Sequence, residues 1–416
     1  MSDTAGTSSQ RTVEQDPHVP ISLQVTVYAI GSFSNSANLM AGVLLPLWAV
    51  AIGASPFVIG VIVGARYFLT SLLSIHGGAM MDRLGTRRIL VVSGAIAALT
   101  TVLFPVLPFV AAAIVLQMLS GLAANYGTIG AQSIFGNLMR GRPKYAGRFA
   151  FGLRVGQLIG PPLAGIAWDL GGHWAGFALL TAWGVGLFVA SLLLPADVDG
   201  ATPSKTPPRI EAHQMMPRLG DYLETFRMMA APAVLLVVIM TFLRMAGQGM
   251  QSSFFVVYLE QLDYTGTVIG LLVGASSLVG FAGALSITNL TRVMAAEWLL
   301  IISVAISIVF VAVTPLIAAS GLLLLLASAA RGAAMGLSQP LMMTILAAAA
   351  GSGRQGKAVG LRTTANRVGS MIVPILMGAV AEVAGIEASF YIIGGVLLAL
   401  MFVSIRPARQ SIDQAR

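Results

Sequence analysis

The stretch Val58-Ile-Gly-Val-Ile-Val-Gly-Ala65 recurs 210 positions later as Val268-Ile-Gly-Leu-Leu-Val-Gly-Ala275. A second segment, Gly147 to Gly172, matches Gly360 to Gly385 without a gap at an offset of 213 positions. Both matches place a segment of the first half of the chain on a segment of the second half. The sequence therefore predicts one fold built twice.

The composition is that of a membrane protein. Of 416 residues, 56% are hydrophobic and 10% are charged, against roughly 25% charged residues in a typical soluble domain. The chain has no cysteine, which excludes disulfides and thiolate sites. Because a bilayer core needs about 20 apolar residues per helix, the apolar runs predict six spans in each half of the chain: 22–52, 57–80, 89–107, 109–135, 147–169, 174–194, and then 233–259, 268–288, 298–317, 321–349, 359–383 and 388–405.

The placement of charges predicts the topology. Outside the spans, Lys and Arg fall on the side of the two termini, whereas the opposite loops carry Asp169, Glu260, Asp263 and Glu387. The positive-inside rule then puts both termini in the cytoplasm, in the plasma (cell inner) membrane, and accounts for the net charge of +8 without nucleic acid. The expected division is a tail at 1–21, a six-helix half at 22–194, a cytoplasmic linker at 195–231, a second half at 232–405 and a tail at 406–416.

Six spans separate the repeated segments, so the two halves have the same orientation in the membrane. Parallel repeats of this kind form transporters whose substrate site lies between the halves. The predicted fold class is an all-α integral membrane protein of twelve transmembrane helices in two six-helix parallel repeats.

The loop between the second and third spans reads Gly78-Ala-Met-Met-Asp82-Arg83-Leu-Gly85-Thr-Arg87-Arg88. This motif resembles that of the major facilitator superfamily, and the resemblance extends over residues 22–405. It implies a gating clamp in which Gly78 and Gly85 allow a tight turn, while Asp82, Arg83, Arg87 and Arg88 hold neighbouring helix ends. The alternative is a solvated positive-inside cluster, which explains the arginines but not the spacing of the glycines and Asp82.

The fifth span carries a second pattern of the family, in which Ala164 replaces one glycine. The resemblance associates this pattern with antiporters, often exporters. Its glycines would let the span pack tightly, and its proline would bend it. The alternative is the small-residue packing common to membrane helices. The residues that match the pattern are Gly147, Gly156, Gly160, Pro161 and Gly165.

Six arginines fall inside spans, while all acidic residues can be placed at span ends, in loops or in tails. A charge inside the membrane costs at least about 2.5–3.5 kcal/mol, so each arginine needs backbone carbonyls, amides, water or an anionic solute. Arg154 and Arg367 correspond in the repeat, which favours a structural role for them. In the family, spans 1, 4, 7 and 10 line a central cavity, which makes the following residues candidates for substrate binding, with structural hydrogen bonding as the alternative: Arg244, Arg331, Asn35, Asn38, Asn125, Gln248, Gln251 and Gln339.

The sequence contains no P-loop, no HExxH and no Ser-His-Asp arrangement, so we expect neither an enzyme nor a bound cofactor or metal. The predicted function is secondary active transport of a small organic solute, favoured as anionic, by alternating access, with antiport and export suggested by the fifth span. The alternatives are a drug-type efflux antiporter for lipophilic compounds and a non-transporting membrane assembly factor on the same fold. The expected partners are the solute, the bilayer and a proton or counter-solute, and the expected state is a monomer.

Overall fold

The computed structural model describes residues 19–139, 143–195, 227–350 and 355–415. Within these ranges every regular element is a helix. Most of the expected linker and most of the N-terminal tail lie outside the described residues.

The N-terminal half follows the predicted order of spans, with one break that the sequence did not indicate. The second span, expected as one helix over 57–80, is interrupted at Arg66–Tyr67. The first and second spans of the half are separated at Gly53, and its last two at Gly172, both with a positive φ that favours glycine. Its helices are α1 (Ile21–Ala51), α2 (Pro56–Ala65), α3 (Phe68–Leu84), α4 (Thr86–Val106), α5 (Val110–Met139) and α6 (Pro143–Leu192), the last broken at Gly171–Gly172 into two spans.

The C-terminal half differs from the prediction in three details, one of which is that the ninth span, expected over 298–317, is divided at Val313. A π-helical turn, η2 (Gln251–Phe255), interrupts the seventh span, and α17 continues to Ala415, past the expected end at 405. The elements of this half are η1 (Met228–Ala230), α9 (Pro232–Met250), η2, α10 (Val256–Gln261), α11 (Gly266–Leu285), α12 (Ile287–Leu290), α13 (Ala296–Ala312), α14 (Thr314–Ile317), α15 (Gly321–Ala350), α16 (Gln355–Ala384) and α17 (Ile386–Ala415).

Ten described helical segments are long and apolar enough to cross a membrane, and α13 is a shorter apolar helix. One of the ten contains both halves of α6, which reverses direction at Gly171–Gly172. Twelve spans result, as the apolar runs predict. Since the spans alternate in direction, all of them have one end on the side of the chain termini, here called the termini side, and one on the opposite, far side.

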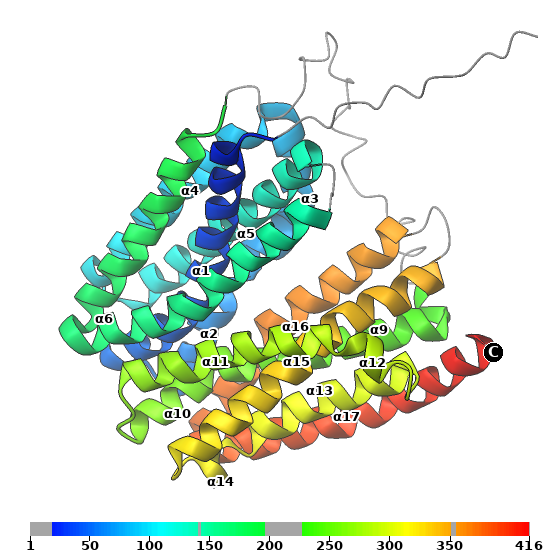
Figure 1. Ribbon diagram of the computed structural model, residues 1–416. Helices are drawn as coiled ribbons and strands as arrows, with labels where there is room; N and C mark the ends of the chain where they lie inside the picture. Colours follow the sequence, from blue (N-terminus) through cyan, green and yellow to red (C-terminus); the bar gives the residue numbers. More distant parts are fainter. Residues whose placement is uncertain (1–18, 140–142, 196–226, 351–354, 416) are drawn as a thin grey trace, which may run out of the picture.

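The two halves are separate bundles that meet along two pairs of helices. Figure 1 shows α11 beside α6 and α16 beside α2, and these pairs make the most extensive contacts between the halves. In the repeat, α6 corresponds to α16 and α2 to α11. The junction therefore has the approximate twofold symmetry that the repeated sequence predicts.

Inside the N-terminal half, the far side is filled by aromatic rings. Trp48, Phe104 and Phe177 are almost completely buried. The Phe104 and Phe177 rings stack with 5.1 Å between their centroids. The Trp48 ring meets both edge-on, with centroid distances of 5.5 Å to Phe104 and 5.8 Å to Phe177. Because the three residues come from the first, third and sixth spans, this cluster fixes those helices against one another.

Close backbone contact joins the halves on the far side. A Cβ atom on Gly165 would meet the Gly266 carbonyl, and one on Gly60 would meet the Pro374 carbonyl. Only glycine permits this approach. Nearer the termini side, Gly147 has no described atom within 4 Å of the position a Cβ would take. The structure is thus closed on the far side, while its helices separate towards the termini side.

Two carboxylates reinforce this closure. Asp169 at the end of the fifth span accepts hydrogen bonds from the Gly266 amide (2.7 Å), the Thr267 amide (2.8 Å) and the Thr267 hydroxyl (2.6 Å). Glu382 accepts one from the Phe57 amide at 3.1 Å. In each case a carboxylate of one half caps the free N–H groups that begin a helix of the other half. Asp169 and Glu382 are 213 positions apart, in register with the repeat.

We expect Gly165→Ala to destabilise the closed far side, because its methyl group would collide with the Gly266 carbonyl. Overpacking of this kind costs about 1–3 kcal/mol, which should lower the thermal unfolding temperature of the detergent-solubilised protein. Gly147→Ala is the matched control, since it adds the same methyl group to the same span in open space. Equal unfolding temperatures for the two variants would contradict the contact.

We expect Asp169→Asn to open the far side more often while preserving shape. Loss of a charged acceptor costs roughly 1.5–3 kcal/mol, or about a 10- to 150-fold larger open population. A Ser277→Cys reporter in the cavity of this cysteine-free chain should then react faster with an impermeant maleimide added on the far side. Asp263→Asn, which removes an exposed charge from the same side, should leave the rate unchanged. Identical rates in both variants would remove Asp169 from the closure.

Candidate functional site

A cavity of about 490 Å³ lies between the halves. This volume is within the range of small-molecule sites. Spans 1, 2, 5, 7, 8, 10 and 11 contribute to its wall, so both halves form it. The polar and charged residues that line it are Asn35, Asn38, Tyr67, Arg154, Gln157, Arg244, Gln248, Gln251, Ser252, Ser276, Ser277, Arg331, Gln339, Asn366 and Ser370.

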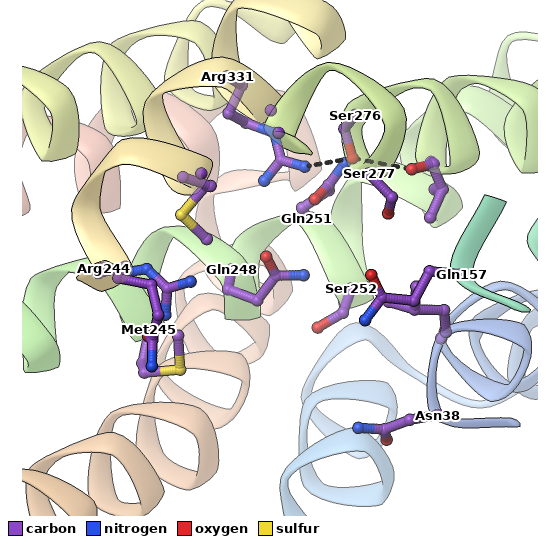
Figure 2. A pocket seen from close by; sticks show the side chains of 18 of the residues that line it. Asn38, Gln157, Arg244, Met245, Gln248, Gln251, Ser252, Ser276, Ser277 and Arg331 are labelled. Atoms are coloured by element: carbon purple, nitrogen blue, oxygen red, sulfur yellow. Dashed lines mark hydrogen bonds between the residues drawn. The ribbon is translucent and has the colours of Figure 1, made fainter. Parts of the chain in front are cut away.

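Arg331 on α15 is the most buried cation of the cavity, with 4% of its surface exposed. Its Nη2 donates a long hydrogen bond of 3.4 Å to the Ser276 hydroxyl, drawn as a dashed line in Figure 2. Its Nη1 is buried and has no hydrogen-bond partner. A guanidinium offers five N–H donors, so Arg331 presents donors that the protein leaves unsatisfied.

Arg244 on α9 enters the cavity from another side (Figure 2). Its Nε donates to the Ser338 hydroxyl at 2.9 Å, which fixes the side chain and leaves the two terminal nitrogens for other acceptors. Arg244 and Arg331 both line the cavity. Two like charges that share a cavity in the membrane interior favour an anion between them.

Arg154 on α6 is a third cation of the cavity wall, contributed by the N-terminal half. Its Nη1 donates to Gln157 Oε1, one helical turn further on, at 3.4 Å. Its repeat counterpart Arg367 does not line the cavity. Arg154 and Arg367 thus differ in their surroundings, and the expected structural role of both stays a prediction.

The π-helical turn shapes the wall between Arg244 and Arg331. Such turns insert one extra residue into a helix and often occur at functional sites. Here the turn begins at Gln251, and Gln248, Gln251 and Ser252 all line the cavity. Figure 2 shows Gln248 and Gln251 on the same side of the two arginines, with Gln251 near Ser276. Their amides can donate to or accept from a polar solute.

No aspartate, glutamate or histidine is among the described residues of the cavity wall. The wall therefore combines three guanidinium groups with neutral amides and hydroxyls. This arrangement suits a solute with negative charge and several hydrogen-bonding groups.

Seven of the eight candidate binding residues line this cavity; Asn125 does not. Its Oδ1 accepts a hydrogen bond from Arg367 Nη2 at 3.0 Å. Asn125 and Arg367 come from spans 4 and 11, so they join the two halves. Asn125 lies outside the cavity lining because the fourth span turns this polar residue towards α16.

Sequence reasoning missed the contribution of spans 5, 8 and 11. Gln157 follows Arg154 at a spacing of three, which puts both on one helix face. Ser276 and Ser277 directly follow the repeated stretch Val268 to Ala275. The repeat could have indicated these serines, since their counterparts in the first half are Arg66 and Tyr67, and Tyr67 also lines the cavity.

The residues of the predicted clamp lie at the turn between α3 and α4. Gly85 has φ 87°, so it makes the turn that the motif requires. Arg87 Nη2 donates to the Leu192 carbonyl at the end of α6 at 3.0 Å. The side chains of Asp82 and Arg83, and the surroundings of Gly78, lie outside the described residues, and Arg88 is exposed. The gating role of these residues stays a prediction.

The glycines of the span-5 pattern have different neighbours. Gly156 and Gly160 face Ser32, Ser36 and Met40 of α1, while Gly165 meets α11. The carbonyl of Pro161 stands against Gly270, also in α11. The pattern thus provides close packing of the fifth span on both halves, with the exception of Gly147.

Three solved structures resemble the whole chain. A variant of the nucleoside transporter NupG superposes with a TM-score of 0.78 at 15% identity, over 92% of this chain and 99% of the other. A POT family transporter in complex with 5-aminolevulinic acid superposes with a TM-score of 0.72 at 13% identity, over 93% of this chain and 96% of the other. A bacterial homologue of the human lysosomal transporter Spinster, in an inward-facing conformation, superposes with a TM-score of 0.70 at 15% identity, over 94% of this chain and 97% of the other. At these identities the likeness establishes the fold.

A comparison with curated protein sequences finds no match. The family model of the Major Facilitator Superfamily matches residues 27–236 and 237–414, one match for each half and together nearly the whole chain. The predicted fold, the twelve spans and the non-enzymatic transport function are in agreement with this result. The chain is a multi-pass membrane transporter of a small solute and belongs to the Major Facilitator Superfamily.

Proposed function

We propose that this transporter moves a small organic anion by alternating access, binding it in the central cavity through Arg244 and Arg331. The observation that carries the proposal is the unpartnered Nη1 of Arg331 in a wall without described acidic residues. A buried donor left unsatisfied costs about 1–3 kcal/mol. An anionic group placed there satisfies the donor and compensates the charge.

Two further parts of the proposal concern direction and location. The resemblance of the span-5 pattern to that of family antiporters, which are often exporters, supports antiport in the direction of export. The segregation of Lys and Arg supports cytoplasmic termini in a plasma (inner) membrane. With that orientation, the described conformation is open towards the cytoplasm. A proton or a counter-solute completes the cycle of a monomeric carrier.

The two alternatives differ in what the cavity binds. In an exporter of lipophilic cations, an acidic residue in the cavity would attract the cation. The described wall of the cavity in this protein contains no acidic residue. An assembly factor on this fold needs no solute site, yet the wall presents three guanidinium groups and seven amide side chains. The anion carrier is favoured because it gives these groups a partner.

Purified protein in liposomes tests the proposal directly. We expect a thermal-shift screen of organic anions and cations to give stabilisation by anions, and labelled forms of those anions to cross protein-containing liposomes but not empty ones. Stabilisation by lipophilic cations followed by their flux would replace the anion carrier with a drug-type exporter. Absence of flux for every stabilising compound would favour the assembly factor.

We expect Arg331→Gln to weaken binding of a stabilising anion about 10- to 150-fold, since a charged hydrogen bond contributes roughly 1.5–3 kcal/mol. Arg331→Lys keeps the charge but not the planar fork, so it should lose less affinity. Titration calorimetry and thermal unfolding on the same samples separate binding from stability.

Arg66→Gln is the matched control for the loss of a buried guanidinium. Arg66 is also buried in the membrane region, donates to Gln117 at 3.3 Å and does not line the central cavity. The Arg66→Gln substitution should lower the stability of the protein with little change in its affinity for the anion. If Arg331→Gln behaves in the same way, Arg331 is structural and does not contact the solute.

A further inference from the structure

The donors of the cavity form two separate positions for negative charge. At the first, Arg331 Nη1 is without a partner and Nη2 makes a weak bond to Ser276. At the second, Arg244 is fixed through Nε by Ser338, and its described hydrogen bonds include none from the two terminal nitrogens. Figure 2 shows that these side chains enter from different sides. A single carboxylate has one charge to share between the two positions.

The wall of the cavity carries positive charge that no described acidic residue of the lining offsets. Arg154, Arg244 and Arg331 contribute three charges. Each uncompensated charge costs at least about 2.5–3.5 kcal/mol in the membrane interior. Guanidinium groups do not lose a proton at physiological pH. Ser338, Gln157 and Ser276 supply neutral acceptors, so an anionic occupant is what would supply the counter-charge.

The same charges bear on the return of the empty carrier. To open the far side, the halves have to separate at Asp169 and Glu382 and come together around the cavity on the termini side. Water then leaves the cavity, and three guanidinium groups remain without counter-charge. With an anion bound, the same movement exposes the site to the other side of the membrane while the bound anion balances the charge of the guanidinium groups. The loaded carrier therefore changes conformation at lower cost than the empty one.

Proton coupling has no group to act through in this wall. Carboxylates and imidazoles take up and release protons near neutral pH, and the described lining contains neither.

We infer that the solute carries at least two negative charges, with one anionic group on Arg331 and Ser276 and another on Arg244, and that the carrier exchanges one such anion for another. This inference rests on the proposed function and narrows it to dicarboxylates and phosphate monoesters. Exchange follows because the bound dianion replaces the missing counter-charge in both directions of the cycle.

The test uses liposomes of neutral lipid, so that lipid phosphates do not occupy the site. Binding is measured for succinate, inorganic phosphate and glycerol phosphate, and for the matched monoanions monomethyl succinate and lactate. We expect the best dianion to bind at least about tenfold more tightly than its monoanion, since the second charged contact contributes roughly 1.5–3 kcal/mol. The labelled dianion should enter liposomes loaded with the same dianion at least about tenfold faster than unloaded ones.

Arg244→Gln should bring the dianion and monoanion affinities together while Arg331 still holds one anionic group. Arg406→Gln, which removes an exposed charge of α17, should preserve the discrimination. Equal binding of monoanions, or equally fast uptake into unloaded liposomes, overturns the inference and leaves the anion carrier standing. If no anion binds and a neutral or cationic solute is carried instead, the proposed function fails as well.

Discussion

The structure depends on direct backbone contact between its two halves on the far side. The helices of the two halves approach closely where Gly165 meets Gly266 and where Gly60 meets Pro374. A larger side chain at Gly165 or Gly60 would prevent this close approach. Asp169 and Glu382 then cap helix ends across the same junction. Because the halves meet here and diverge towards the termini side, a cavity remains between them in the middle of the membrane. The binding site is a consequence of where the halves come into contact.

Symmetry in the closure contrasts with asymmetry in the site. The junction uses repeat-related residues, Asp169 with Glu382 and α2 with α11, so each half supplies the same kind of contact. In the cavity, by contrast, Arg244 and Arg331 belong to the C-terminal half, and Arg154 has diverged in environment from Arg367. The two repeated halves allow the halves to move relative to each other. The residues that differ between the halves, such as the cavity arginines, determine which solute is recognised.

The cavity also links binding energy to conformational change. The unsatisfied Nη1 of Arg331 lowers the stability of the protein when the cavity is empty. On the far side, only a few charged hydrogen bonds between the described residues have to break before the halves can separate. A ligand shifts such an equilibrium only by its differential affinity for the two conformations. A site with excess positive charge gives an anion that differential affinity wherever water is excluded. Selectivity and transport thus have a common electrostatic origin.

The sequence by itself determined the twelve spans, the parallel repeat, the family and most of the cavity residues of spans 1, 7 and 10. These follow from apolar length, periodicity and the rarity of charge in a membrane, all of which act locally along the chain. The tertiary structure decided that Asn125 bonds Arg367, that Arg154 and Ser276 enter the cavity, and that Asp169 caps α11. Such pairings depend on how helices are rotated and which glycines allow them to approach, and these quantities arise only when distant segments pack together.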